Sequence, residues 1–178
     1  MLTLPRIFVS VLLLGMLANP GLALKKYKIL DYPTTLNFSA LESAYGDHNL
    51  GMRFPCFIFV INNRDGAKRV PEWKNYLKKQ YPKIPIYGVA GLRDMPKLIQ
   101  PMTTESLKEE PLVYLYDWNG NLNEQIFITL DIFTEEKIKP PGLVLLMMDK
   151  DGRLQREPWE LNNYTSFGDT LKEVKKFF

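Results

Sequence analysis

The residues best suited to chemistry in this 178-residue chain are one cysteine and one histidine, Cys56 and His48. A single cysteine cannot form an intrachain disulfide, and thiol–disulfide exchange needs a second thiol to resolve the mixed disulfide. A metal site needs several convergent ligands, which this pair does not supply. Cys56 begins an apolar run, so we expect a small buried core residue. We expect His48 in a solvated loop, and we expect no metal or other cofactor.

The polar segment from Asn62 to Arg69 is the second place where side chains could do chemistry. Its three cations, Arg64, Lys68 and Arg69, come just before an amphipathic pattern. Free backbone N–H groups at the start of a helix favour anions. The sequence therefore offers an anion-binding site here. The alternative is a loop of solvated charges, in which Asp65 neutralises one cation.

Apolar patterns predict the elements that would position these residues. The unbroken apolar run over 56–61 is typical of a central strand covered on both faces. Apolar residues recur every three or four positions over 70–81, which predicts an amphipathic helix. Further strands are expected over 84–89, 112–116 and 143–148, and further helices over 96–110, with a break at Pro101, and after Ser166. The pattern over 122–128 fits a helix or a strand, and helix is the favoured interpretation. Strands that alternate with helices predict an α/β sandwich with a mixed sheet.

The first 23 residues have the layout of a secretory signal peptide. One arginine, Arg6, precedes an apolar run over 7–17, and Gly21-Leu22-Ala23 provides small residues for cleavage. The run is too short to cross about 30 Å of hydrocarbon, which disfavours the alternative of a retained membrane anchor. Cleavage after Ala23 removes one basic residue and leaves 22 basic and 20 acidic residues. This small net charge gives no argument for nucleic-acid binding.

Three sequence phrases agree in their order and spacing with one known family. They are the strand–loop–helix phrase over 57–73, the strand and Asp-Trp-Asn-Gly turn over 111–120, and the proline–strand–Asp-x-x-Gly hairpin over 141–153. Together they resemble the thioredoxin-like superfamily, in its redoxin branch of exported bacterial proteins. The resemblance covers residues 54–178 and implies a thioredoxin-like sandwich, a central mixed β-sheet flanked by helices. Residues 24–53 then form an N-terminal extension.

The resemblance also locates the family's redox site, a Cys-x-x-Cys pair followed five residues later by a proline. Here Pro71 matches that proline, so the cysteine positions fall on Asn63 and Gly66, with Arg64 and Asp65 between them. The chemistry requires a thiolate stabilised at a helix N-terminus and a second thiol. Neither asparagine nor glycine can serve as either, so this loop is a degenerate active site.

Two geometric expectations follow from the same resemblance. The family has a cis-proline just before the strand matched here by 143–148, so the peptide bond before Pro140 or Pro141 is expected to be cis. The Cα atoms of Asn63 and Gly66 are expected to lie about 5–6 Å apart, within disulfide range. Cysteines introduced at both positions would then oxidise readily.

These observations favour a non-catalytic, exported thioredoxin-fold protein that binds a protein or peptide partner or a small ligand. The alternative is a thiol oxidoreductase or peroxidase that uses Cys56. A third hypothesis is an anion-binding module at 62–69. We expect the protein in the periplasm or secreted, with no nucleic-acid partner and no stable membrane anchor after cleavage.

Cleavage is directly testable on the exported protein. Because Gly21-Leu22-Ala23 ends the apolar segment, N-terminal sequencing is expected to begin at Leu24. A full-length chain that remains in the membrane fraction would contradict this prediction.

Overall fold

The computed structural model describes residues 27–28, 30–43, 51–108, 112–127, 137–163 and 165–175. The expected signal peptide and His48 lie outside the described residues. The strands are β1 (Thr34–Thr35), β2 (Glu42–Ser43), β3 (Cys56–Ile61), β4 (Ile86–Gly91), β5 (Val113–Asp117), β6 (Leu143–Met148), β7 (Arg153–Leu154) and β8 (Trp159–Glu160). The helices are α2 (Arg64–Gln80), η1 (Lys97–Ile99), α3 (Gln100–Lys108), α4 (Asn121–Ile126) and α5 (Phe167–Val174).

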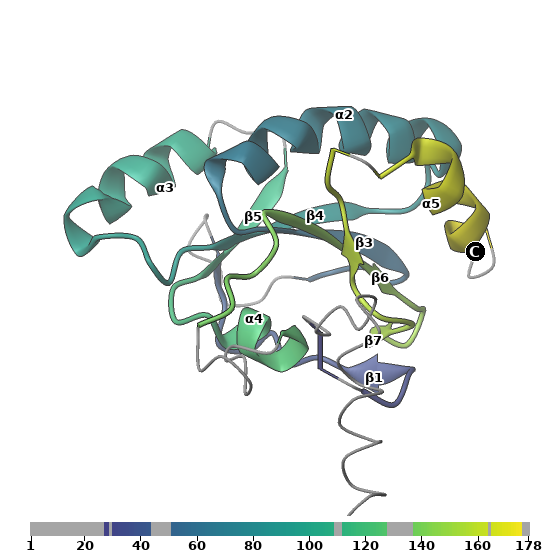
Figure 1. Cartoon of the computed structure of the whole chain (residues 1–178), viewed down its shortest axis with the longest axis horizontal. Coiled ribbons are helices and arrows are strands. Elements are labelled where there is room, and N and C mark those ends of the chain that lie inside the picture. The colour runs from purple at the N-terminus through teal and green to yellow at the C-terminus, as the bar shows by residue number, and fades with distance from the viewer. Residues whose placement is uncertain are drawn as a thin grey trace, which may run out of the picture.

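The strands form one mixed sheet in the order β1-β7-β6-β3-β4-β5-β2, with β8 paired to β6. β3 lies in the middle, parallel to β4 and antiparallel to β6. Helices α2, α3 and α5 cover one face of the sheet and α4 covers the other (Figure 1). The expected α/β sandwich is therefore confirmed. Its outer strands β1 and β2 come from the N-terminal segment before residue 54.

The sequence of β3 explains how both faces are covered. All six residues of β3 are buried, as its unbroken apolar run predicts. Successive side chains of a strand point to opposite faces. Phe57, Phe59 and Ile61 pack in the core that also contains Trp73 of α2. Cys56, Ile58 and Val60 pack in the second core, which contains Leu122 and Ile126 of α4.

Helix α2 begins six residues earlier than its apolar pattern predicts. Asn63 is the N-cap residue, and its side chain accepts a hydrogen bond of 2.8 Å from the backbone N–H of Gly66. The segment 64–69, expected as a loop, is therefore helical. Its first turn lacks an apolar stripe because the residue that faces inward there is glycine, which is buried against backbone.

The backbone of Gly66, in the first turn of α2, packs directly on the backbone of Gly142, the residue before β6. A Cβ added at Gly66 would lie 2.0 Å from the carbonyl oxygen of Gly142, and one added at Gly142 would lie 2.7 Å from Asn63 Oδ1. Contacts below 3.0 Å require one of the two groups to shift, and at Gly66 the group that would have to shift is backbone. The expectation that a cysteine at position 66 fits and readily forms a disulfide with position 63 is therefore wrong. Gly66 has no positive φ, so its backbone conformation does not disfavour a side chain. The obstacle is the close approach of the Gly142 carbonyl.

The peptide bonds before Pro140 and Pro141 are trans. Among the described residues the cis bonds precede Pro33 and Pro55, so the expectation of a cis bond at 140 or 141 is wrong. The segment reaches the loop after β3 in the trans form, which X–Pro bonds generally prefer. Asn62 binds it with two hydrogen bonds, from its backbone N–H to the Gly142 oxygen (2.9 Å) and from Nδ2 to the Pro141 oxygen (2.8 Å).

The close contact predicts opposite effects for two glycines that lie in the first turns of helices. Gly66→Ala should lower the free energy of unfolding by about 1–3 kcal/mol, because the new methyl group must displace the Gly142 carbonyl. Gly168 in α5 has nothing within 4 Å of an added Cβ. Gly168→Ala should therefore be neutral or stabilise by up to about 1 kcal/mol. Urea denaturation measures both, and equal stability of the two variants would contradict the contact.

Candidate functional site

The candidate site lies at the edge of the sheet where the parallel strands β3, β4 and β5 end. The carboxyl ends of parallel strands are the usual location of binding sites in open α/β sheets. Here the edge is formed by Asn62 and Asn63 after β3, the turn 92–96 after β4, and Asp117 at the end of β5. The antiparallel strand β6 starts at the same edge, so residues 140–142 complete it.

The three cations proposed for anion binding do not lie together. Lys68 forms an ion pair of 2.8 Å with Asp65, which is the pairing expected in the alternative interpretation. This cation holds the pKa of the Asp65 carboxyl below its ordinary value, through their hydrogen bond and their charge attraction. At 100° per residue, Arg64 and Lys68 share one side of α2, whereas Arg69 points well away from both. The N–H groups of Gly66 and Ala67 already bond to Asn63.

A pair of side-chain amides joins the loop after β3 to helix α4. Asn123 Nδ2 donates a hydrogen bond of 2.9 Å to Asn62 Oδ1, while Asn62 Nδ2 donates to the carbonyl of Pro141. A carbonyl can only accept, so it fixes the orientation of both amides. The pair lies against Gly91, where an added Cβ would be 2.2 Å from Asn62 Oδ1. Asn123 Oδ1 is buried without a hydrogen-bond partner in the described part of the chain. A buried acceptor without a partner destabilises the folded state.

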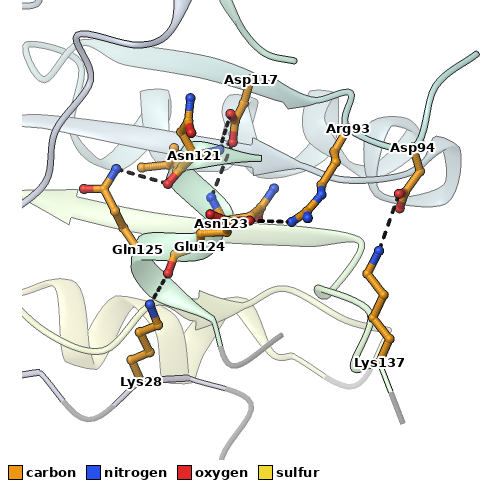
Figure 2. A network of polar contacts seen from close by, with 10 residues as sticks. Lys28, Arg93, Asp94, Asp117, Asn121, Asn123, Glu124, Gln125 and Lys137 are labelled. Carbon is orange, nitrogen blue, oxygen red and sulfur yellow. Dashed lines mark hydrogen bonds and ion pairs between the residues drawn. The ribbon is translucent and has the colours of Figure 1, made fainter. Parts of the chain in front are cut away.

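Asp117 holds α4 so that Asn123 can reach the edge of the sheet (Figure 2). Its carboxylate is fully buried and accepts backbone N–H bonds from Asn121 (2.7 Å), Leu122 (3.0 Å) and Asn123 (3.4 Å). A carboxylate at the first turn of a helix satisfies N–H groups that have no partner within the helix. The sequence pattern assigned Asp117 only to a turn. An acidic residue at the end of an apolar strand, two residues before Asn-Gly, is the signal that could have indicated its role.

A cavity of about 290 Å³ opens beside the amide pair. Two ion pairs lie at it: Arg93 with Glu124 at 2.7 Å, and Lys137 with Asp94 at 3.9 Å (Figure 2). Each cation is matched by one carboxylate, so these four residues add no net charge. The remaining lining is mostly apolar and includes Leu92, Met95, Phe127 and Pro140.

A second, larger hollow of about 600 Å³ adjoins the first and lies between the start of α2 and the segment η1–α3. We call it the α2 groove. It shares Asn62, Leu92, Met95 and Ile99 with the smaller cavity. Asn63, at the matched position of the first family cysteine, lines it. The loop interpreted from the sequence as a degenerate redox site therefore forms one wall of a mainly apolar groove. The other lining residues are Ile61, Arg64, Ala67, Ala90, Gly91, Met102 and Thr103.

Cys56 lies away from this edge. It is the first residue of β3, whose other end leads into α2, and five residues of strand span roughly 17 Å. Its side chain belongs to the core on the face opposite α2, and the residue is 0% exposed. Burial raises the pKa of the Cys56 thiol to about 12. The expectation of a buried core cysteine is confirmed.

The described residues contain no cluster of three or more His, Cys, Asp or Glu side chains that could hold a metal ion. Within the same residues, no helix has the length and apolar character needed to cross a membrane.

No protein-family model matches the sequence, and no curated protein does. Solved structures do match over most of the chain. A thiol:disulfide interchange protein candidate, DsbE of Chlorobium tepidum, has a TM-score of 0.57 at 10% identity, over 84% of this chain and 100% of its own. A thiol peroxidase of Chromobacterium violaceum has a TM-score of 0.52 at 10% identity, over 84% of this chain and 88% of its own.

A domain of a candidate thiol-disulfide isomerase from Cytophaga hutchinsonii matches with a TM-score of 0.50 at 13% identity, over 83% of this chain and 95% of its own. Such identities show a common fold and nothing about a common reaction. The chain has a thioredoxin-like fold that contains one cysteine, and that cysteine is buried away from the family's redox position.

Proposed function

We propose that this is a non-catalytic, exported protein that binds a segment of a partner protein, or a peptide, in the α2 groove. The observation that supports this most is an apolar groove beside a helix N-terminus that carries no sulfur. The helix N-terminus that would bear a thiolate is capped by Asn63, and an apolar groove of about 600 Å³ lies next to it. Concave, mostly apolar surfaces with a few polar groups are the usual form of a binding site.

The polar part of the groove is suited to orienting a bound chain. Asn62, Asn63 and the ends of β3 and β4 supply amide groups, while Leu92, Met95 and other apolar residues supply burial. A small ligand is the second occupant that the groove could take. Exposed apolar side chains at its rim favour a polypeptide, because a small molecule within the groove would leave them in water.

The alternative thiol enzyme has little support. A nucleophilic cysteine needs an accessible thiolate. Cys56 is buried, its thiol pKa is raised, and its side chain points to the face opposite the groove. A thiol-dependent reaction at the groove would require the central strand of the sheet to move.

Site-specific photocrosslinking tests partner binding. A photoreactive residue placed at Met102, which is exposed and lines the groove, should give a discrete adduct in the native compartment. The matched control is Asp151, an exposed residue in the turn after β6, at the opposite end of that strand. The absence of an adduct at Met102, or equal adducts at both positions, would refute the groove as the binding site.

Accessibility of Cys56 tests the alternative function. In native protein the thiol should react with a chromogenic disulfide reagent at least about 100-fold more slowly than in denaturant, because burial excludes the reagent and raises the pKa. A high pKa also means that raising the pH to about 9 should not produce fast labelling. Rapid native labelling, or peroxide consumption that Cys56→Ser abolishes, would restore the thiol-enzyme hypothesis.

A further inference from the structure

The rim of the α2 groove carries exposed apolar side chains. Leu98, Ile99 and Met102 of η1 and α3 are 89%, 43% and 74% exposed. Ile99 and Met102 also line the groove, so the exposed patch is continuous with its apolar wall. Contiguous exposed apolar residues mark interaction surfaces in water-soluble domains. A partner therefore places apolar side chains here.

The neighbouring side of α2 is basic. At 100° per residue, an arc of about 140° of this helix contains five cations and no carboxylate. The five residues are Arg64, Lys68, Lys74, Lys78 and Lys79. Within the described part of the chain, Lys68 is the one cation of the five that forms an ion pair, with Asp65, which lies outside the arc. The arc includes the side chain of Ala67, a residue that lines the groove.

The packing of α5 fixes which flank of α2 faces the groove. Trp73 and Tyr76 stack on Phe167 of α5, with ring centroids 4.4 Å and 4.2 Å apart. The flank of α2 that carries Tyr76 is therefore covered by α5. Glu72 and Asp65 lie toward that covered flank. The basic arc lies on the side of α2 that faces away from the sheet and on the flank toward α3. Arg64, the first residue of the arc, lines the groove. The arc continues from there along α2, and Asp65 pairs with Lys68 alone among its five cations.

We propose, building on the proposed function, that the groove recognises a partner segment in which apolar residues are followed or preceded by several carboxylates. The apolar side chains enter between Ala67, Ile99 and Met102, and the carboxylates lie along the basic arc of α2. The two ion pairs at the smaller cavity are internally neutral, so the unbalanced charge comes from α2. Charge complementarity of this kind selects partners and speeds their association.

The dimensions fit an extended chain. The arc from Arg64 to Lys79 covers 15 helical steps, or about 22 Å, which equals about seven residues of extended polypeptide. An anionic membrane shares the chemistry of an acidic segment, but its surface is flat. Ile99 and Met102 line a hollow, which a polypeptide side chain can fill and a bilayer surface cannot.

The test is a selection of random 12-residue peptides, displayed on phage, against the immobilised exported protein. Enriched peptides should combine an apolar cluster with adjacent Asp or Glu residues. A representative synthetic peptide should bind about tenfold more weakly to Lys78→Glu/Lys79→Glu at low salt, since each exposed charge contact is modest. Lys150→Glu, an exposed lysine in the turn after β6, is the matched control and should leave the affinity unchanged.

The outcomes separate the two proposals. Peptides that are enriched without acidic residues, or that bind equally to the charge-reversed variant, would overturn the acidic-segment inference and leave groove binding intact. Peptides that bind equally well after Met102→Glu would overturn binding in the α2 groove. If no peptide is enriched and the protein instead sediments with phosphatidylglycerol vesicles, but not with phosphatidylcholine vesicles, the basic arc serves a membrane surface and the inference is wrong.

Discussion

The contact between Gly66 and Gly142 determines much of the geometry at the functional edge. Two backbones approach so closely that an added methyl group on Gly66 would lie 2.0 Å from a carbonyl oxygen. The contact sets the height of the first turn of α2 above the sheet. It also brings the Pro141 and Gly142 carbonyls within reach of Asn62, which binds both. Gly91 provides the third close approach, since any side chain there would displace the Asn62 amide.

This arrangement has consequences for chemistry at the helix N-terminus. A free N-terminus stabilises a thiolate because its N–H groups and dipole favour negative charge. Here Asn63 satisfies one of those N–H groups with a neutral oxygen. The second cysteine position lacks room for any side chain. Packing as well as residue identity therefore disfavours a cysteine at position 66, because its side chain would require the backbone before β6 to move.

Sequence patterns predicted the parts of the fold that apolar side chains specify. β3 and β6 follow from unbroken apolar runs, and α5 from its Ser166 cap, whose hydroxyl accepts the Asp169 N–H at 3.1 Å. The start of α2 was missed because backbone packing, rather than an apolar stripe, holds its first turn. The two-residue strands β1, β2 and β8 depend on pairing with distant partners and leave no local pattern.

The candidate site was predictable only in part, because much of it depends on contacts between residues that are far apart in the sequence. The loss of sulfur at Asn63 and Gly66 can be read directly from the residues. The amide pair cannot, because Asn62 and Asn123 are 61 residues apart and meet only when Asp117 positions α4. The sequence placed Arg69 together with Arg64 and Lys68, whereas the helix directs Arg69 away from the other two, because adjacent helical residues point in different directions. The fold thus separates Arg69 from Arg64 and Lys68, which are close in sequence, and brings Asn62 into contact with the distant Asn123.

The separation of Cys56 from the groove determines the kind of binding that this surface can perform. In the proposed function, a partner in the α2 groove is held only by noncovalent contacts, because Cys56 is buried on the opposite face of the sheet. Residence time then depends on the apolar area buried against Ile99 and Met102, because exposed charge pairs contribute little to dissociation rates. Under the proposed recognition of an acidic segment, the basic arc of α2 acts earlier, by raising the rate of encounter. A shallow apolar groove beside a charged helix therefore suits fast, reversible capture rather than permanent assembly.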